Sequence, residues 1–257
     1  MNTITRIRKG NPLIHCITNI VVANFKANGL LAVGASPVMA DAIEEVEEMT
    51  GIASGLLINI GTLHARSVEA MKLAGKRANQ VGIPLVLDPV GAGATSYRLN
   101  TVREILEEVN IQVLRCNVGE LAAIANSPWE AKGVDSGKGE LDVVFTAQEV
   151  AKKYNCIVAV SGEVDIVTDG KQVEEIIGGD ARMPLVTGSG CLLSALCCSA
   201  VATTEKDDFQ AVVDVMHFYK RIGEYAGRNS IGAGDFAVHI LNGLDLLSKR
   251  EEVEWSK

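Results

Sequence analysis

Short apolar runs alternate with amphipathic segments along this chain. Each run is rich in β-branched residues and ends in Gly, Pro, Asp or Asn, which is typical of a buried strand. The runs are LLINIG (56–61), IPLVLDPV (83–90), IQVLRCN (111–117) and CIVAVSG (156–162). Between and after them, apolar residues recur at helical spacing in 63–81, 96–108, 118–125 and 146–154. This alternation predicts an α/β fold with a central, mostly parallel sheet and helices on both faces.

The pattern changes after the fourth strand. Residues 164–176 contain two short strand patterns on either side of Asp169-Gly170, which is a strong hairpin signal. Only helical patterns follow, at 191–204, 209–229 and 233–247. The polar, Gly-rich stretch at 133–142 predicts a surface loop and not a domain linker. Because the alternation never restarts, we expect a single domain over residues 1–257.

Composition narrows the classes of function. The 257 residues carry a net charge of -8, which argues against nucleic-acid binding, although a nucleotide can still be held by backbone amides and magnesium. The six cysteines form neither a CxxC pair nor a zinc pattern, so we expect buried, reduced thiols in a cytoplasmic protein. We see no signal peptide and no uncharged run near the roughly 20 residues of a membrane helix.

Ligands of parallel sheets bind beyond the carboxyl ends of the strands. The polar residues at these ends are Asp88, Arg115, Asn117 and Ser161, and the turn TGSGC (187–191) follows the hairpin. We therefore expect these side chains to share one site.

The turn TGSGC is a candidate anion site. Gly188, Ser189 and Gly190 allow a ligand close to the backbone, and the helix predicted to begin at Cys191 would present positive potential and free N–H groups. The alternative is an ordinary helix start with Ser189 as N-cap.

Three further positions also have two interpretations. Asn117 and Glu120 are spaced to hold a hydrated magnesium ion, but the same spacing forms a capping box. Asp88 has two interpretations as well. It is either a second carboxylate, placed near magnesium or near the attacking hydroxyl of the substrate, or part of a turn-forming Asp-Pro pair. Met39 either lines an apolar pocket for a heterocycle or packs in the core.

The segment IGAGDF (231–236) resembles the GAGD signature of sugar kinases, in which the aspartate is the catalytic base. Only 22 residues follow Asp235, and the segment lies two long helices beyond the hairpin. We therefore interpret it as the turn that caps the last helix.

Five segments together resemble one family, the hydroxyethylthiazole kinases, which have a ribokinase-like fold. They are NPLIHCITNIVVANFKANGLLAVGASPVMA (11–40), LVLDPVGAGAT (85–95), RCNVGEL (115–121), VSGEVDIVTDG (160–170) and VTGSGCLLSA (186–195). The resemblance implies ATP- and Mg²⁺-dependent phosphorylation of the hydroxyl of 5-(2-hydroxyethyl)-4-methylthiazole in thiamine salvage. It also implies a homotrimer with sites at the subunit interfaces.

The resemblance also implies roles for single residues, by matching motif. Met39 and Gly188 are expected to bind the thiazole alcohol, Arg115 and Ser161 to bind ATP, and Asn117 and Glu120 to lie at magnesium. From their own positions in the chain, Ser189 and Gly190 are expected to bind the phosphates of ATP and Asp88 to lie near magnesium. Cys191 stands where the broader superfamily has its aspartate base. Ser161 and Ser189 replace threonines common in the family, and GAGDF replaces a Gly-Pro-Gly-Ser type of turn.

A thiol is a mediocre base for an alcohol. The helix N-terminus is expected to lower the pKa of Cys191, whereas bound phosphates would raise it. Cys191 therefore either accepts the hydroxyl proton late or only positions the hydroxyl. Two other functions remain open: a kinase for a pyrimidine or vitamin B6 type of alcohol, and a non-catalytic thiazole-binding protein.

Overall fold

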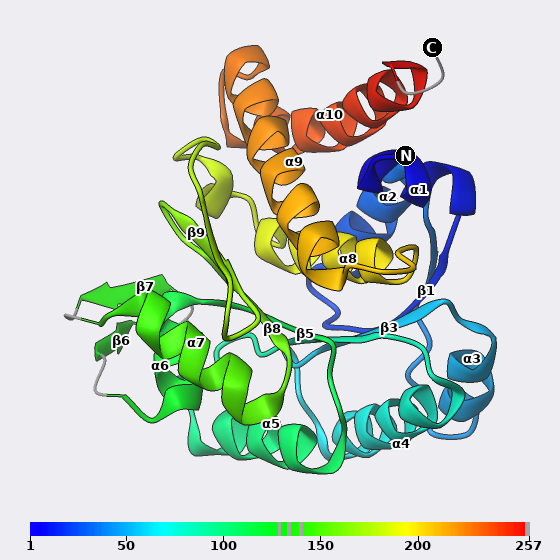
Figure 1. Ribbon diagram of the computed structural model, residues 1–257, viewed down its shortest axis with the longest axis vertical. Helices are drawn as coiled ribbons and strands as arrows, with labels where there is room; N and C mark the ends of the chain where they lie inside the picture. The colour runs from blue at the N-terminus through cyan, green and yellow to red at the C-terminus, as the bar shows by residue number, and fades with distance from the viewer. Residues whose placement is uncertain (128–129, 133–134, 139–140, 255–257) are drawn as a thin grey trace.

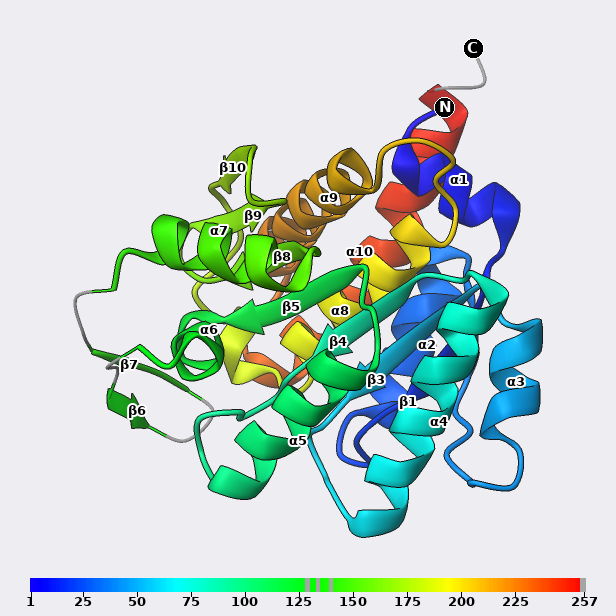
Figure 2. The same cartoon turned by 60° about the horizontal axis from the view of Figure 1, so that its bottom comes forward.

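A computed structural model describes residues 1–127, 130–132, 135–138 and 141–254. Its centre is an eight-stranded sheet with the order β10-β9-β8-β5-β4-β3-β1-β2 (Figure 2). The strands are β1 (Leu13–Ile17), β2 (Ser36–Val38), β3 (Gly55–Asn59), β4 (Leu85–Asp88), β5 (Val113–Asn117), β8 (Ile157–Ser161), β9 (Asp165–Thr168) and β10 (Val173–Ile176). The strands from β8 to β2 in this order run parallel to one another. At the other edge, β9 pairs antiparallel with β8, and β10 pairs antiparallel with β9. The predicted fold class is confirmed.

Strand register brings the polar strand ends together. Asn59 at the end of β3 lies opposite Asp88 at the end of β4. Asn117 at the end of β5 likewise lies opposite Ser161 at the end of β8. Because parallel strands end at one edge of the sheet, these side chains meet on the side where ligands bind.

One group of helices covers one face of the sheet (Figure 1). They are α1 (Thr3–Gly10), α2 (Ala23–Val33), α8 (Ser189–Val201), α9 (Asp208–Asn229) and α10 (Ala233–Glu254). Helix α8 lies directly on the sheet and is apolar on all sides, so from Leu192 to Val201 every residue is buried. Strand residues such as Cys16, Leu57 and Val86 complete this half of the core.

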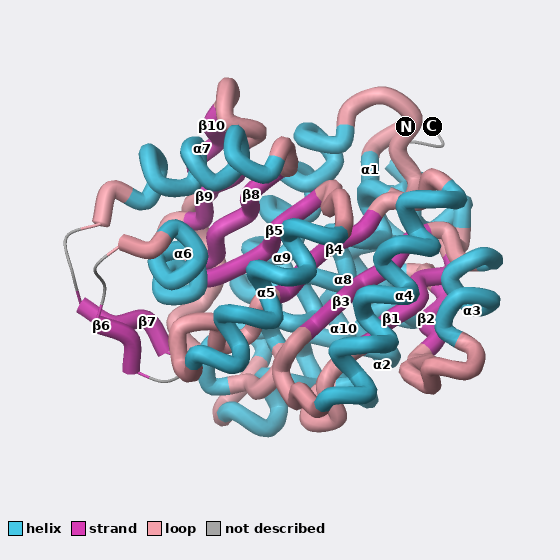
Figure 3. The backbone as a smooth tube through the Cα atoms, turned by 90° about the horizontal axis from the view of Figure 1, so that it is seen from below, coloured by secondary structure: helices cyan, strands magenta, loops and turns pink. Residues whose placement is uncertain are grey.

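A second group of helices covers the opposite face, as the view from below shows (Figure 3). They are α3 (Val46–Ile52), α4 (Ala65–Val81), α5 (Ser96–Glu108), α6 (Val118–Ala125) and α7 (Val143–Tyr154). Leu56, Ile58 and Leu87 point into this half of the core and alternate with residues of the other half. A sheet buried on both faces explains why its strands are continuous apolar runs.

The sequence predicted the central elements closely but not the N-terminal third. Helices at 96–108 and 118–125 and the hairpin around Asp169-Gly170 occur as predicted. Elements α1, β1, β2 and α3 were not predicted. His15 interrupts the apolar pattern of β1, yet it is fully buried because Thr50 Oγ1 (2.9 Å) and the Ala40 carbonyl (2.7 Å) bind its two ring nitrogens.

Two segments differ from the expected loops. Within 133–142, Asp135–Lys138 forms β7, which pairs antiparallel with β6 (Glu130–Lys132); residues 133–134 and 139–140 lie outside the described part. A short 3-10 helix, η1 (Met183–Leu185), precedes the turn TGSGC. In the part of the chain that is described, no helix has both the length and the apolar character needed to cross a bilayer.

Candidate active site

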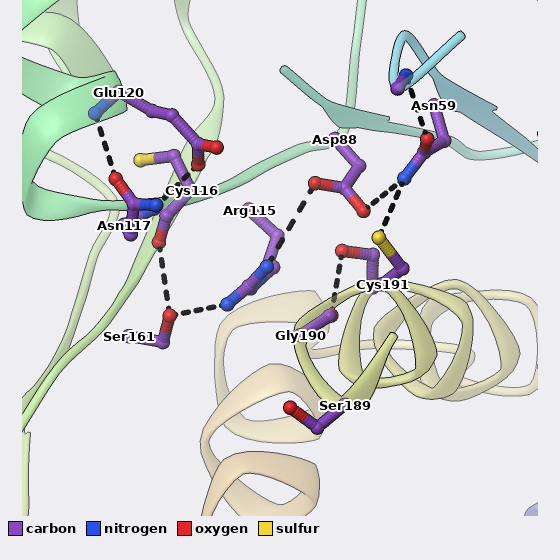
Figure 4. Close-up of polar contacts among 12 residues, drawn as sticks. Asn59, Asp88, Arg115, Cys116, Asn117, Glu120, Ser161, Ser189, Gly190 and Cys191 are labelled. Atoms are coloured by element: carbon purple, nitrogen blue, oxygen red, sulfur yellow. Dashed lines mark hydrogen bonds and ion pairs between the residues drawn. The ribbon is translucent and has the colours of Figure 1, made fainter. Parts of the chain in front are cut away.

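The candidate site lies where the carboxyl ends of β3, β4, β5 and β8 face the first turn of α8. Arg115, Asp88, Asn59 and Cys191 point toward one another there, and Ser161 reaches Arg115 from β8 (Figure 4). This is the edge and the turn that the sequence analysis singled out.

Arg115 is the central cation of the site. Its guanidinium is buried, donates to Ser161 Oγ through Nη2, and lies with Nη1 3.8 Å from Asp88 Oδ1. A Cβ atom added at Gly190 would lie 3.0 Å from Nη1, so the guanidinium packs directly on the backbone of the turn. The fold thus brings together three of the four residues predicted to bind ATP.

Ser189, the fourth of them, is oriented differently. Its hydroxyl donates to the Met183 carbonyl (2.9 Å) and its side chain points away from Arg115. The N-cap of α8 is Gly188 and not Ser189, so the alternative that made Ser189 the N-cap is wrong, and the helix begins two residues before the predicted start at Cys191. Its role in ATP binding stays a prediction.

Gly188 is required by the backbone of the turn. Its φ is +92°, a left-handed conformation that favours glycine, and an added Cβ would lie 2.9 Å from Val22 Cβ. The Ser189 N–H already bonds to the Val186 carbonyl and the Leu192 N–H to the Gly188 carbonyl. The N–H groups of Gly190 and Cys191, in the first turn between them, have no intrahelical acceptor and suit an anion.

Two asparagine amides hold the sulfur of Cys191. Asn59 Nδ2 donates to Sγ at 3.2 Å and to Asp88 Oδ2 at 2.5 Å. Asn19 Nδ2 lies 3.8 Å from Sγ and donates to Asn59 Oδ1 at 2.7 Å. Cys191 is therefore linked to Asp88 through one side-chain amide.

The expected lowering of the Cys191 pKa is not observed. Burial, followed by the charge of Asp88, raises the pKa of this thiol to about 11, and Lys26, the Asn59 hydrogen bond and Arg115 lower it only in part. The reason is that the first turn of α8 is packed against the sheet, where the thiol is largely desolvated and the charged form is disfavoured. All six cysteines are free, and Cys191 alone of them is not buried.

This pKa makes a testable statement about thiol chemistry. At pH 8 we expect iodoacetamide to label Cys191 at least about tenfold more slowly than free cysteine, since only the thiolate reacts. Labelling should accelerate as the pH rises toward 11, because a group with a raised pKa stays protonated below it. Peptide mass spectrometry over a pH series measures this, with Cys191→Ser as the blank. A rate equal to that of free cysteine at pH 8 would contradict it.

Asn117 and Glu120 form the capping box of α6. Asn117 Oδ1 accepts from the Glu120 N–H (2.9 Å), and Glu120 Oε2 accepts from the Asn117 N–H (2.8 Å). Glu120 Oε1 accepts from the Gly91 N–H (2.9 Å). Burial, followed by the charge of Asp88, raises the pKa of Glu120 to about 7. The capping interpretation is confirmed, and it leaves Glu120 a buried carboxyl at the edge of the site.

Asp88 is the side chain best suited to a magnesium ion. It is fully buried, and its Oδ1 has no hydrogen-bond partner among the described residues. Mg²⁺ is usually held by one or two carboxylates, waters and substrate phosphates, so a carboxylate oxygen that accepts no hydrogen bond fits this ion. This oxygen also lies 3.8 Å from Arg115 Nη1. Within the described residues, no cluster of three or more His, Cys, Asp or Glu side chains is arranged as a metal site.

Met39 lies apart from these groups. It follows β2 at the sheet edge, three strand spacings from Asp88, which is about 14 Å across the sheet. It is 37% exposed, so it is not a core residue. A role in binding the thiazole stays a prediction.

Asp235 caps the last helix, as the sequence indicated. Its carboxylate accepts the N–H groups of Ile231 and Gly232, each at 2.7 Å. These hydrogen bonds lower the pKa of Asp235. That the GAGD segment has no catalytic role stays a prediction.

Several residues of the site were not predicted from the sequence. Asn59 lies inside the strand predicted over 56–61, and the structure ends β3 at this residue, so a polar side chain within an apolar run was the available signal. Asn19 and Tyr219 carried no such signal: Tyr219, from α9, donates its hydroxyl to the Ser189 carbonyl at 2.8 Å. Lys220 forms a buried ion pair with Asp165 (2.9 Å) and donates to the Gly162 carbonyl, which fixes the loop after Ser161.

Comparisons with known proteins agree on one family. A family model described as the hydroxyethylthiazole kinase family matches residues 4–250. A hydroxyethylthiazole kinase of Lysinibacillus sphaericus is 55% identical, covering 96% of each chain, and one of Haemophilus influenzae is 52% identical over 95% of this chain and 93% of that one.

Solved structures agree with this. A hydroxyethylthiazole kinase protein from Pyrococcus horikoshii superposes with a TM-score of 0.86 at 39% identity, over 95% of this chain and 91% of that one. A ribokinase-like superfamily protein from Enterococcus faecalis has a TM-score of 0.67 at 11% identity, covering 97% and 89% of the two chains, which shows the fold alone.

Proposed function

The chain belongs to the hydroxyethylthiazole kinase family, and from this premise we propose that it phosphorylates the hydroxyl of 5-(2-hydroxyethyl)-4-methylthiazole with ATP. The product is the thiazole phosphate used in thiamine salvage. One observation carries this conclusion. The chain shares about half of its residues with several hydroxyethylthiazole kinases over nearly their whole length.

The reaction is a single phosphoryl transfer. The hydroxyl oxygen attacks the γ-phosphorus of ATP and forms a new O–P bond. The bond from the γ-phosphorus to the β,γ-bridging oxygen breaks, and ADP leaves with that electron pair. The hydroxyl proton is released to a base or to water. Since the transition state is loose, positioning and charge neutralisation supply most of the catalysis.

The site residues suit these tasks. In this proposal, the free N–H groups of the α8 first turn hold the transferring phosphoryl group, beside the Arg115 guanidinium. Ser161, Ser189 and Gly190 border the nucleotide, and Gly188 and Met39 contact the thiazole alcohol. Support comes from the packing of Arg115 on Gly190 and from its bond to Ser161.

Magnesium is part of the proposal. Asp88 would hold the ion through Oδ1, which accepts no hydrogen bond among the described residues and lies 3.8 Å from Arg115 Nη1, with Asn117 and Glu120 bordering it. When bound, the ion neutralises negative charge on the phosphates.

Cys191 is proposed to position the hydroxyl or to accept its proton late. With a pKa near 11, most of the thiol is neutral at physiological pH, which favours the positioning role in the unliganded protein. A loose transition state tolerates so weak a base.

Packing at Gly190 gives a prediction for the nucleotide. Gly190→Ala should displace the Arg115 guanidinium and raise the KM for ATP by about tenfold, or about 1.4 kcal/mol of binding. Steady-state kinetics with varied ATP tests this. Gly234→Ala is the matched control, because an added Cβ at Gly234 meets no atom within 4 Å. Equal effects of the two variants would contradict the prediction.

We further propose a homotrimer with active sites between subunits, formed by a chain that is one kinase domain in the cytoplasm. The separation of Met39 from Asp88 supports a site shared between chains, as do the exposed apolar side chains of Ile20 (84%) and Val21 (66%) next to Asn19. Free thiols support a reducing compartment.

Dilution tests the assembly. If neighbouring chains complete each site, separating the subunits should abolish turnover and not merely lower stability. Sedimentation velocity and activity are measured over the same range of protein concentration. A fully active monomer would exclude the shared site.

An assay of ADP release with a panel of alcohols tests the function itself. Thiazole alcohol should be the preferred acceptor over pyrimidine and vitamin B6 alcohols. Preference for either of those would assign a different kinase, and thiazole binding without ADP release would indicate a non-catalytic binding protein.

A further inference from the structure

Lys26 is a fully buried lysine in the first turn of α2. Its Nζ donates to Thr18 Oγ1 at 2.5 Å. Among the residues that the structure describes, no carboxylate forms an ion pair with it. Burying a charge without a counter-charge is costly, so a lysine at this position requires an explanation other than stability.

Helix α2 presents Lys26 to the first turn of α8. Val22, four residues earlier, lies against Gly188, and a Cβ added at Gly29, three residues later, would overlap Leu192. Residues three and four apart share one face of a helix. Lys26 therefore faces α8 between Gly188 and Leu192, which is the turn that contains Cys191, and the two helices pack together in the fold (Figure 2).

Ionisable groups from several elements surround this turn, including Tyr219 of α9, whose hydroxyl donates to the Ser189 carbonyl. Lys26 from α2 and Arg115 from β5 favour negative charge on Cys191, whereas Asp88 from β4 opposes it. Lys26 also acts on two buried thiols, Cys16 of β1 and Cys198 of α8. Of the three thiols on which Lys26 acts, Cys191 is the one at the site and the one that is not buried.

We propose that Lys26 is a positioning residue of the active site, whose buried ammonium provides a fixed positive charge behind Cys191 and stabilises negative charge at that position. Lys26 does not touch the substrate; it acts through Cys191. Its effect on turnover rests on the proposed function, but its effect on Cys191 does not.

The charge can be removed with little change of shape. Lys26→Gln keeps an N–H donor for Thr18, and Lys26→Arg restores the charge. We expect Lys26→Gln to shift the pH midpoint of Cys191 labelling by iodoacetamide upward by about one unit, a tenfold fall in thiolate at fixed pH, and Lys26→Arg to stay near wild type. Thr18→Val, which keeps the charge and removes its acceptor, is the control and should label like wild type. An unshifted midpoint in Lys26→Gln would overturn the proposal.

A second measurement needs no thiol. Cys191→Asp places a carboxylate at the same position, and Lys26 should then stabilise it. We expect this substitution to lower Tm by on the order of 3 °C more in the Lys26→Gln background than in wild type. Additive shifts in Tm would overturn the proposal, even if Lys26→Gln alone melts higher.

Turnover separates this inference from the proposed function. If wild-type protein releases no ADP with any alcohol, the proposed function fails while the labelling and melting results still decide the role of Lys26. If wild type is active, Lys26→Gln should lower kcat severalfold and change the KM for ATP much less, because the Lys26 ammonium bonds to Thr18 and is proposed to act through Cys191. If Lys26→Gln weakens ATP binding and leaves kcat unchanged, the result would count against the proposed role of Lys26.

Discussion

Replacing Cys191 with alanine is expected to lower turnover by about 100-fold while the protein stays folded, in line with the loss of one proton acceptor when metal and positioning remain. The side chain is small and only partly enclosed, so the thermal melt should change little. Turnover is measured at saturating ATP and thiazole alcohol.

Cys191→Asp should keep or raise turnover. An ordinary aspartate has a pKa near 4, so even with Asp88 nearby a carboxylate at this position is ionised far more often than a thiol with a pKa of about 11. Asn59 can donate to a carboxylate oxygen as it does to the sulfur. A loss of turnover as large as that of Cys191→Ala would indicate that the thiol itself is required.

Asp235→Asn is the control for this assignment. Its carboxylate caps α10, so the substitution should cost at most about 1 kcal/mol of stability and leave turnover unchanged. Loss of turnover in a well-folded Asp235→Asn, with Cys191→Ala unaffected, would move the active site to the last helix.

Asp88→Asn is expected to have the second large effect, a fall in turnover of about 100-fold or more. The reason is that neutralising the charge on the transferring phosphoryl group supplies much of the catalysis, and Asp88 is the proposed ligand of the ion that does so. The substitution removes the unpartnered carboxylate oxygen and places an amide toward Arg115. The concentration of Mg²⁺ at half-maximal activity should rise as well.

Glu120→Gln is the matched comparison. It should lower turnover much more than it changes the KM for the thiazole, because the lost charge acts on the phosphates and their metal. The substitution also places an NH₂ group against one of the two backbone N–H groups, of Gly91 and Asn117, that Glu120 accepts. The weakened cap should cost about 1 kcal/mol of stability. Both carboxylate oxygens of Glu120 already accept hydrogen bonds. The dependence of activity on Mg²⁺ should therefore change less in Glu120→Gln than in Asp88→Asn.

Mg²⁺ titrations of both variants, with thermal melts, separate the two roles. Wild-type turnover of Glu120→Gln at limiting Mg²⁺ would leave Glu120 a capping residue only. If the Mg²⁺ requirement shifts more in Glu120→Gln than in Asp88→Asn, the ion is held by Glu120 and the proposed assignment to Asp88 is wrong.

The elements that could be predicted are those specified by local pattern. The four buried strands and helices α5 and α6 follow from apolar periodicity and end signals, which act over a few residues. Strand β1 was missed because His15 interrupts its pattern, and the groups that satisfy its ring come from Ala40 and Thr50, distant in sequence. No local rule includes such partners.

The sequence by itself determined the fold class, the family, and the edge of the sheet where Asp88, Arg115, Ser161 and the turn TGSGC would meet, because parallel strands must end on the same side. Only the tertiary structure decided the states of these groups. Whether the Cys191 pKa is lowered by a helix N-terminus or raised by burial depends on what packs around that turn. That Lys26 is buried beside it depends on how α2 packs against α8. Desolvation and charge act through space between residues far apart in the chain, so no pattern of neighbouring residues contains them.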